Sequence, residues 1–189
     1  MTDLEVVNRA LTFIGVAPIG SLNDNTQTAR VMAALLPDTK RVVLNEFPWS
    51  FAMRIDPLVA SSSPAPAGYS YAFEYPAGAL NVQRVYDATG FRGVAEYRVI
   101  GNVIGANVPS GTVEYTAFVE DVSSWPRQIA ECLTTRLASD AATALTGSMQ
   151  VSMGLLEKYM ALARVASQTS VVEENVPPAR VTDYVQARK

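Results

Sequence analysis

The stretch Asn45-Glu46-Phe47-Pro48-Trp49-Ser50-Phe51-Ala52 joins two different hydrophobic patterns. Over residues 26–46 the apolar residues recur near helical spacing, whereas from Phe51 onward they alternate with polar residues as in a strand. Proline lacks the N–H of a continuing helix and disfavours helical angles in the residue before it. We therefore expect the helix to end here, a strand to begin at Trp49 or Ser50, and Phe47, Pro48, Trp49 and Phe51 to form a domain hinge. These aromatic side chains either anchor a core between helices and a sheet or contact another subunit.

Two helices precede this hinge. Thr2 and Glu5 have the spacing of a capping box, and Gly15 is placed to end the first helix. The second helix has Asn25 or Thr26 as its N-cap, and Pro37 is expected to kink or split it. We expect the two helices to pack as a hairpin.

The region after the hinge reads as β structure. Tyr69, Tyr71, Phe73 and Tyr75 alternate with smaller or polar residues, and Gly101-Asn102 lies between two strand patterns as in a tight hairpin. The Pro- and Ser-rich residues 61–68 are expected to form an exposed loop. Five or six short antiparallel strands are expected, which is enough for a small sandwich or barrel.

Helical patterns return after the β region. Ser124 and Pro126 are expected to start a third helix that ends at Gly147, and a fourth should run from Met149 to about Ala166. The fourth pattern is apolar over so much of its circumference that the helix either is central to a bundle or packs between subunits. From Ser167 the pattern breaks down, and the last residues should form an extended tail that is frayed or that orders on binding.

The expected fold class is therefore α+β, with a four-helix bundle, an inserted small antiparallel β module and an extended C-terminal tail. Residues 1–49 and 124–169 would form the bundle, residues 50–123 the β module, and residues 170–189 the tail. Each helix pair alone would expose an apolar face, which is why we expect one bundle.

The composition limits the possible chemistry. The chain has 189 residues, a net charge of −3 and no histidine, so it lacks a global positive field for nucleic acid, Ser-His-Asp triads and histidine metal ligands. Its single cysteine, Cys132, excludes an intrachain disulfide and is expected to be a small buried apolar residue. The N-terminus does not read as a signal peptide, and no apolar run reaches the roughly 18 residues of a membrane span. Synthesis in the cytoplasm and no membrane partner are expected.

Carboxylates are the remaining catalytic candidates. The β module contains Glu74, Glu96, Glu114, Glu120 and Asp121, two of which could form the acid pair of a glycosidase. Acids also commonly lie on the solvated face of an alternating strand, and neither a Gly-rich phosphate loop nor metal-ligand spacing is present. We therefore expect no catalytic residues, no cofactor and no metal.

The residues around the hinge also resemble a known family. The run Leu35-Leu36-Pro37-Asp38-Thr39-Lys40-Arg41-Val42-Val43-Leu44-Asn45-Glu46-Phe47-Pro48-Trp49-Ser50-Phe51-Ala52 is similar to tail tubular protein A of short-tailed phages (podoviruses). The family pattern, a helix ending in Trp-x-Phe-Ala and followed by an aromatic strand that ends in proline, is matched by Trp49-Ser50-Phe51-Ala52 and by Tyr71-Ala72-Phe73-Glu74-Tyr75-Pro76. A further strand resembling Leu80-Asn81-Val82-Gln83-Arg84-Val85 follows, and the likeness covers nearly the full chain.

This resemblance implies a structural head-to-tail adaptor, or connector, in the neck of the virion tail, assembled in the bacterial host cytoplasm. Such proteins form a ring, typically of twelve copies, between the portal protein and the tail nozzle (tail tubular protein B-like), and phage DNA passes through the lumen without sequence recognition. The bundle and tail would contact the portal, with Arg180, Val181, Tyr184 and Arg188 as candidate portal-interface residues, and the β module would contact the nozzle. The alternative is a tail-associated peptidoglycan-cleaving enzyme that uses carboxylates. A third reading is a cytoplasmic oligomeric binding module unrelated to phage.

Overall fold

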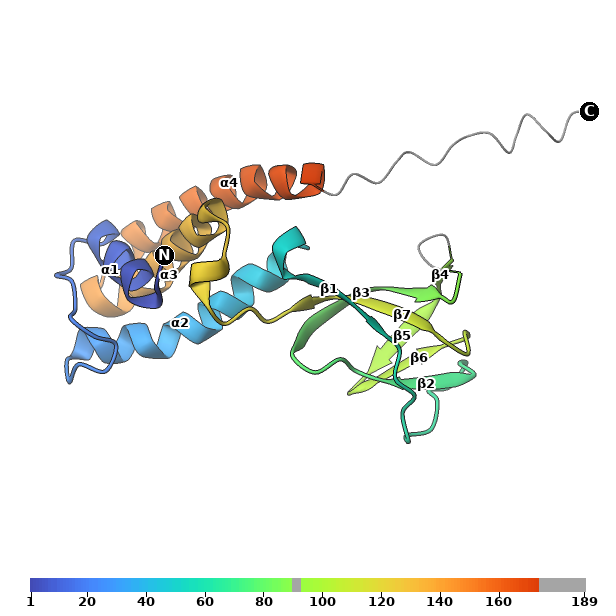
Figure 1. Cartoon of the computed structure of the whole chain (residues 1–189). Helices are drawn as coiled ribbons and strands as arrows, with labels where there is room; N and C mark the ends of the chain where they lie inside the picture. Colours follow the sequence, from blue (N-terminus) through green and yellow to red (C-terminus); the bar gives the residue numbers. More distant parts are fainter. Residues whose placement is uncertain (90–92, 174–189) are drawn as a thin grey trace, which may run out of the picture.

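The computed structural model describes residues 1–89 and 93–173, which form a helical lobe and a β lobe (Figure 1). The chain starts in the helical lobe, crosses to build the β lobe, and returns to the helical lobe. Within the described residues there are four α-helices and two antiparallel sheets, which confirms the expected α+β class.

The helices are α1 (Asp3–Phe13), α2 (Gln27–Glu46), α3 (Arg127–Thr146) and α4 (Met149–Glu173). The capping box of α1 is confirmed: the Thr2 backbone N–H donates to Glu5 Oε2 at 2.8 Å, and the Glu5 N–H donates to Thr2 Oγ1 at 3.3 Å. Thr26 caps α2 by accepting from the Ala29 N–H at 3.1 Å. Both helices therefore begin where their side chains satisfy otherwise unpaired N–H groups.

Helix α3 is the centre of the helical lobe. It packs against α1, α2 and α4, and its buried side chains lie on most sides of the helix. The expected hairpin of α1 and α2 is not confirmed: the apolar stripe of each helix packs on α3, and an ion pair between Asp3 and Lys40 joins the two helices. Of the two alternatives for Pro37, a kink or a split, the split is wrong: α2 is continuous, and Leu36, Thr39 and Lys40 near Pro37 are buried.

Two element boundaries differ from expectation on either side of the β lobe. The chain after Trp49 first makes a 3₁₀ turn, η1 (Ser50–Ala52), because the Ala52 and Met53 N–H groups donate to the Trp49 carbonyl at 2.9 and 3.1 Å. The strand therefore begins only at Met53. On the return, Ser124 ends a second 3₁₀ turn, η2 (Val122–Ser124), and Pro126 is the N-cap of α3 without a side-chain bond.

Helix α4 is longer than expected. It continues to Glu173, past the expected end near Ala166 and past the domain boundary at residue 169. Val171 and Val172 have modest helix propensity, and tertiary packing overrides such a preference. The packing is supplied nearby by Ala166, which is 5% exposed, and by Ser170, which bonds to Ser50.

The β lobe is a two-sheet sandwich. Its strands within the described residues are β1 (Met53–Pro57), β2 (Tyr71–Glu74), β3 (Ala79–Asp87), β4 (Val94–Ala95), β5 (Tyr97–Ile100), β6 (Val103–Ala106) and β7 (Gly111–Ala117). The larger sheet has the order β1-β7-β3-β4 and the smaller sheet the order β2-β6-β5. Both sheets contribute to one core, which consists of Phe73, Val82, Val85, Ile104, Ala106, Val113 and Tyr115. Seven strands form where five or six were expected.

One turn and one close contact of the β lobe depend on glycine. The expected hairpin between β5 and β6 is confirmed, and Gly101 adopts a φ of 59° that side-chain-bearing residues avoid. The loop at residues 61–68 contains no buried residue, as expected of an exposed loop, but it contacts β6 at one point: a Cβ at Gly105 would lie 2.9 Å from the Pro66 ring. Pro66 therefore packs against β6 where no side chain intervenes.

Candidate functional site

The hinge residues lie where the chain leaves the helical lobe. Trp49 is 0% exposed and belongs to the helical core, and its indole N–H donates to the Val43 carbonyl at 2.7 Å. The Phe47 ring packs edge-on against it, with centroids 5.3 Å apart. Helix α2, the turn after it and Trp49 thus pack as one unit. This packing fixes the position at which the chain leaves the helical lobe toward the β lobe.

The return crossing is built in the same way. Trp125 is 5% exposed, and its indole N–H donates to the Val119 carbonyl at 3.1 Å. Its ring lies 5.6 Å from the ring of Phe51, which belongs to the outgoing crossing. The two crossings therefore contact each other through aromatic side chains.

Lys40 adds an ion pair and a hydrogen bond at this junction. Its side chain is 4% exposed, and its ammonium donates to Asp3 Oδ2 at 2.9 Å and to the Glu120 carbonyl at 2.7 Å. Next to it, the Arg41 guanidinium lies 4.5 Å from the centroid of the Phe118 ring. Neighbouring cations of α2 thus hold the segment after β7 against the helical lobe.

The end of α4 is bonded to the outgoing crossing. The Ser50 N–H donates to Ser170 Oγ at 2.9 Å, and the two hydroxyls lie 3.1 Å apart. Tyr159 on the same helix is buried and donates its hydroxyl to the carboxylate of Glu46. Burial first, and then this bond, raise the pKa of Tyr159, so the phenol stays neutral and remains a donor.

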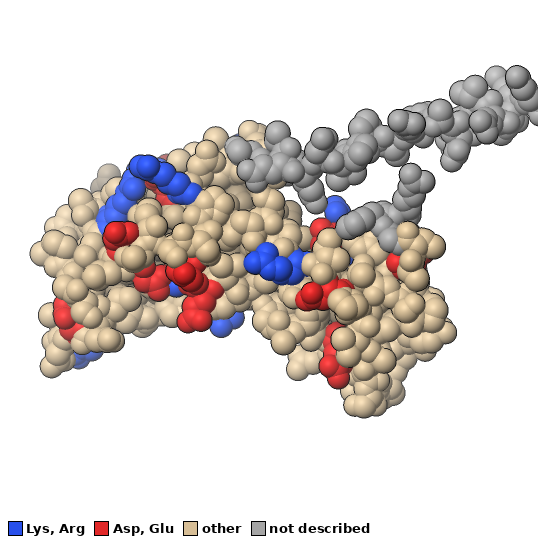
Figure 2. All heavy atoms as spheres, viewed as in Figure 1, with Lys and Arg blue, Asp and Glu red and all other residues tan. Residues whose placement is uncertain are grey.

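The outer surface of α4 is unusually apolar. Five large apolar side chains are 39–62% exposed along it: Met149, Val151, Met153, Met160 and Val165. Figure 2, which shows one face of the molecule, has wide uncharged areas between separate groups of charged side chains. The sequence left two alternatives for this helix: a position at the centre of a bundle, or packing between subunits. A purely central position is wrong, because α4 has an exposed apolar face that a partner could cover.

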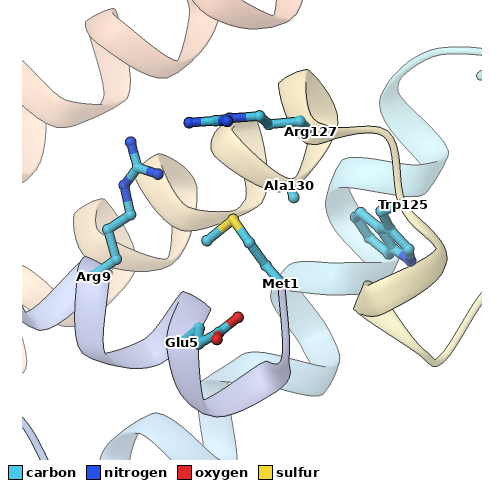
Figure 3. A pocket seen from close by; sticks show the side chains of 6 residues that line it. All are labelled: Met1, Glu5, Arg9, Trp125, Arg127 and Ala130. Atoms are coloured by element: carbon cyan, nitrogen blue, oxygen red, sulfur yellow. The ribbon is translucent and has the colours of Figure 1, made fainter.

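A cleft of about 500 Å³ lies between α1 and the start of α3 (Figure 3). It is lined by Met1, Glu5, Arg9, Trp125, Arg127 and Ala130. Arg9 Nη2 donates to Glu131 Oε1 at 2.6 Å, so this guanidinium is already paired. The lining is mixed in charge and does not bring two carboxylates together.

The candidate carboxylates of the β lobe do not assemble into one site. Glu74 lies on β2 of the smaller sheet, Glu114 on β7 of the larger sheet, and Glu96 between β4 and β5. Glu114 is 5% exposed; the Tyr86 hydroxyl donates to it at 2.6 Å, and Arg84 Nη1 lies 3.5 Å away. Its carboxylate is therefore engaged with a phenol and a guanidinium.

Glu120 and Asp121 have local roles at the return crossing. Glu120 offers its backbone carbonyl to Lys40, whereas the Asp121 carboxylate accepts from the Ser123 hydroxyl and N–H at 2.7 and 2.8 Å. These bonds lower the pKa of Asp121. Both residues thus shape the turn that precedes α3.

Cys132 is a buried apolar residue, as expected. It is 0% exposed on α3, and burial raises the pKa of its thiol to about 11. A thiol of this kind is almost entirely protonated at neutral pH and is a poor nucleophile.

The remaining sequence-based candidates cannot be placed. Arg180, Val181, Tyr184 and Arg188 lie outside the described residues. Among residues 1–89 and 93–173, no group of three or more Cys, Asp or Glu side chains is arranged to hold a metal ion. In the same part of the chain, no helix combines the length and apolar character needed to cross a bilayer.

The sequence did not point to several contacts of the junction. The burial of Lys40 and its bonds to Asp3 and Glu120 join segments far apart in the chain, as does the bond between Ser50 and Ser170. The apolar outer surface of α4, in contrast, was indicated by the low charge of its sequence pattern.

Comparison with known proteins gave no match to any family model and none to any curated protein.

Proposed function

We propose that this protein is a structural head-to-tail adaptor of a short-tailed phage, similar to tail tubular protein A. In this proposal it forms a ring, typically of twelve copies, between the portal protein and a nozzle similar to tail tubular protein B. Phage DNA passes through the lumen without sequence recognition, and the protein resides in the neck of the virion tail after assembly in the host cytoplasm. It needs no catalytic residues and no cofactor.

The observation that carries this proposal is the outer surface of α4. Met149, Met153 and Met160 are 55–60% exposed, which is costly for a helix that faces only water. A ring buries the same face in every copy, because each contact joins two different surfaces of neighbouring subunits. Exposed methionines suit such a contact, since their flexible side chains adapt to a partner surface.

The arrangement of the two lobes also supports the proposal. The four helices would act as one bundle directed to the portal, and the sandwich would be directed to the nozzle. Trp49 and Trp125 pack at the two crossings, and Lys40 holds the segment that returns from β7, so the lobes would keep a defined relative geometry. An adaptor between two rings of fixed shape requires such a junction.

The charge of the β lobe is consistent with a DNA channel. Residues 51–124 contain seven acids and four arginines but no lysine. A wall of this kind offers few cations to phosphate groups, and phosphate contacts dominate nonspecific DNA affinity. DNA could therefore slide past without being held.

Mass measurement with and without a portal ring tests the proposal. We expect the purified protein to be a monomer or weak oligomer that becomes a closed ring on the portal. A stable soluble dimer that does not bind the portal would contradict the adaptor function.

A charged substitution on α4 tests the observation itself. Met153→Glu should abolish ring formation on the portal while leaving the melting temperature nearly unchanged, because the side chain is 58% exposed. Gln150→Glu, which adds the same charge at an exposed polar position of the same helix, is the matched control and should retain the ring. If Met153→Glu assembles as well as the control, this region of α4 is not the interface between copies.

A further inference from the structure

Another cleft, of about 410 Å³, lies at one edge of the sandwich. Strand β1 is at the edge of the larger sheet and β2 at the edge of the smaller sheet, and Asp56 of β1 and Glu74 of β2 both line the cleft. Val59, in the segment that joins these strands, also lines it and is 57% exposed. We call this site, on the side of the sandwich where both sheets end, the edge cleft.

The lining of the edge cleft combines apolar surface with carboxylates. Tyr75, Tyr115 and two prolines contribute to it, and no lysine or arginine is among the lining residues of the described chain. The Tyr115 hydroxyl donates to Asp56 Oδ2 at 2.6 Å, which leaves the other oxygen of Asp56 able to accept. Such a lining suits a cation that is carried on an apolar stem, as in an arginine side chain.

Glu74 is the carboxylate of the edge cleft that is open to a partner. Within residues 1–89 and 93–173, its side chain has neither a hydrogen bond nor an ion pair. Its backbone is held, because the Glu74 N–H donates to the Val59 carbonyl at 2.8 Å. The carboxylate is therefore positioned by the strand and still has all its acceptor sites unused.

The exposed side of α4 carries a cation next to apolar surface. At about 100° per residue, Met153, Met160 and Arg164 lie within about 40° of one another around the helix. Both methionines are more than half exposed, and Arg164 is exposed as well. In the part of the chain that the structure describes, the Arg164 guanidinium has no partner, and Glu157 is seven residues, or about 10 Å, away along the helix. We call these three residues the α4 flank.

We propose that the α4 flank of one copy docks into the edge cleft of the next copy, which rests on the ring of the proposed adaptor function. Met160 then packs against Val59. Arg164 pairs with the carboxylates of Glu74 and Asp56, because the planar guanidinium matches a carboxylate with two parallel N–H groups. The two surfaces are complementary in charge as well as in apolar character.

The positions of the two surfaces fit a contact between neighbours in a ring. The α4 flank lies on the helical lobe and the edge cleft on the β lobe (Figure 1), so each copy has one of each. A head-to-tail contact joins two such different surfaces and is repeated until the ring closes. Arg164 also lies in the half of α4 that ends near the β lobe, where Ser170 bonds to Ser50. The flank is therefore on the side of the lobe that it has to reach in the next copy.

Disulfide trapping between full-length copies tests the contact. Met160→Cys combined with Val59→Cys should give a ladder of linked dimers, trimers and longer products at high protein concentration, with and without the portal. Each copy carries both halves of the contact, so either single variant should stay monomeric. Cys132 does not interfere, because it is buried and its thiol has a raised pKa.

The matched control moves only the cysteine on α4. Val165→Cys combined with Val59→Cys places it at a side chain that is 62% exposed but lies about 140° around the helix from Met160. This pair should react about tenfold more slowly, because docking does not raise its effective concentration.

Charge exchange in the same trapping assay tests the ion pair. Adding Arg164→Glu should slow formation of the ladder at least about tenfold, because like charges then meet in the cleft. Adding Glu74→Arg as well should restore most of the rate, since opposite charges face each other again. Lys158→Glu is the control: it makes the same change of charge on the other flank of α4, where Lys158 lies 4.4 Å from the centroid of the Phe13 ring, and should leave the rate nearly unchanged.

Three outcomes would overturn the docking. They are the absence of a ladder from the double-cysteine variant, dimers from Met160→Cys alone, which would assign the flank to the same flank of a second copy, and a rate that Arg164→Glu leaves unchanged. A wild-type ring on the portal beside any of them would leave the adaptor function intact. A ladder without a ring on the portal would instead support the docking and contradict the adaptor function.

Discussion

Trp49 and Trp125 flank the β lobe in the sequence but belong to the core of the helical lobe. Each indole N–H donates to a backbone carbonyl six residues earlier, that of Val43 or Val119. Trp49 thus fixes the direction of the chain where it leaves the helical lobe, and Trp125 does so where the chain returns. Aromatic side chains combine large apolar burial with one donor that must be satisfied, which suits this role.

Replacing Trp49 tests how strongly the hinge stabilises the molecule. Trp49→Ala removes a fully buried side chain and should lower the free energy of unfolding by about 3–5 kcal/mol, measured by urea denaturation. Trp49→Phe keeps most of the packing and loses mainly the bond to the Val43 carbonyl, so it should cost less. A loss below about 1 kcal/mol for Trp49→Ala would show that the hinge does not organise the fold.

Tyr115 predicts a specific loss of stability at alkaline pH. Burial, assisted by the bond from its hydroxyl to Asp56, raises the pKa of Tyr115 to about 12 from its ordinary 10.0. Because this pKa is higher in the folded than in the unfolded state, the neutral Tyr115 phenol contributes to the free energy of unfolding. This contribution is fully present below pH 10 and is lost as the pH rises from 10 toward 12. Tyr115→Phe should therefore be less stable near neutral pH yet lose less stability over this interval. Parallel pH profiles of the two proteins, from urea denaturation followed by circular dichroism, would contradict this.

At the scale of the elements, α4 has different surroundings along its length. Its inner side packs on α3 through Tyr159 and Ala163, which are 0% and 1% exposed. Its last turns contact the outgoing crossing through Ser170. The helix thus connects the helical core, the hinge and the start of the C-terminal segment.

The Ser50–Ser170 contact should control the stability of the end of α4. Ser170→Ala leaves the Ser50 N–H without this acceptor and should cost about 1 kcal/mol. Amide hydrogen exchange should become faster in the last turns of α4 and remain unchanged in α3. Ser167→Ala is the control, because the Ser167 hydroxyl donates only locally, to the Arg164 carbonyl at 2.9 Å. Equal exchange in both variants would contradict a role of the contact in ordering this end.

At the scale of the molecule, two separate apolar cores stand out. The helical core includes Trp49 and Trp125, whereas the core of the sandwich lies between the two sheets. The lobes meet through the crossings, through the bonds of Lys40 and Ser50, and where β3 contacts α2 with Leu80 against the helical core. Lobes joined by a limited contact can unfold as separate units.

We therefore predict that the two lobes respond independently to core substitutions. Both tryptophans of the chain lie in the helical core, so tryptophan fluorescence reports that lobe. Ile104→Ala should shift the tyrosine circular dichroism transition of the β lobe, at a cost of about 2–5 kcal/mol, and leave the fluorescence transition in place. Leu137→Ala, also fully buried, should do the reverse. Shifts of both transitions by both variants would show one cooperative unit.

Several local features were predictable from the sequence because their causes lie within a few residues. The capping box of Thr2 and Glu5, the end of α2 before Pro48 and the hairpin turn at Gly101 follow from short-range sterics and hydrogen bonds. The change of period at the hinge separates the helical and β regions for the same reason. The portal-interface residues of the tail stay a prediction.

The tertiary structure alone decided which apolar faces meet. Helical spacing shows that α1, α2 and α3 each have an apolar stripe, but only packing makes α3 the common partner of α1, α2 and α4. Packing also buries Lys40 and Glu114 with their partners and carries α4 to Glu173. The contacts of Lys40, Glu114 and Ser170 join residues tens of positions apart. The sequence therefore determined the elements and their faces, whereas long-range packing determined the partner of each face and left that of α4 open.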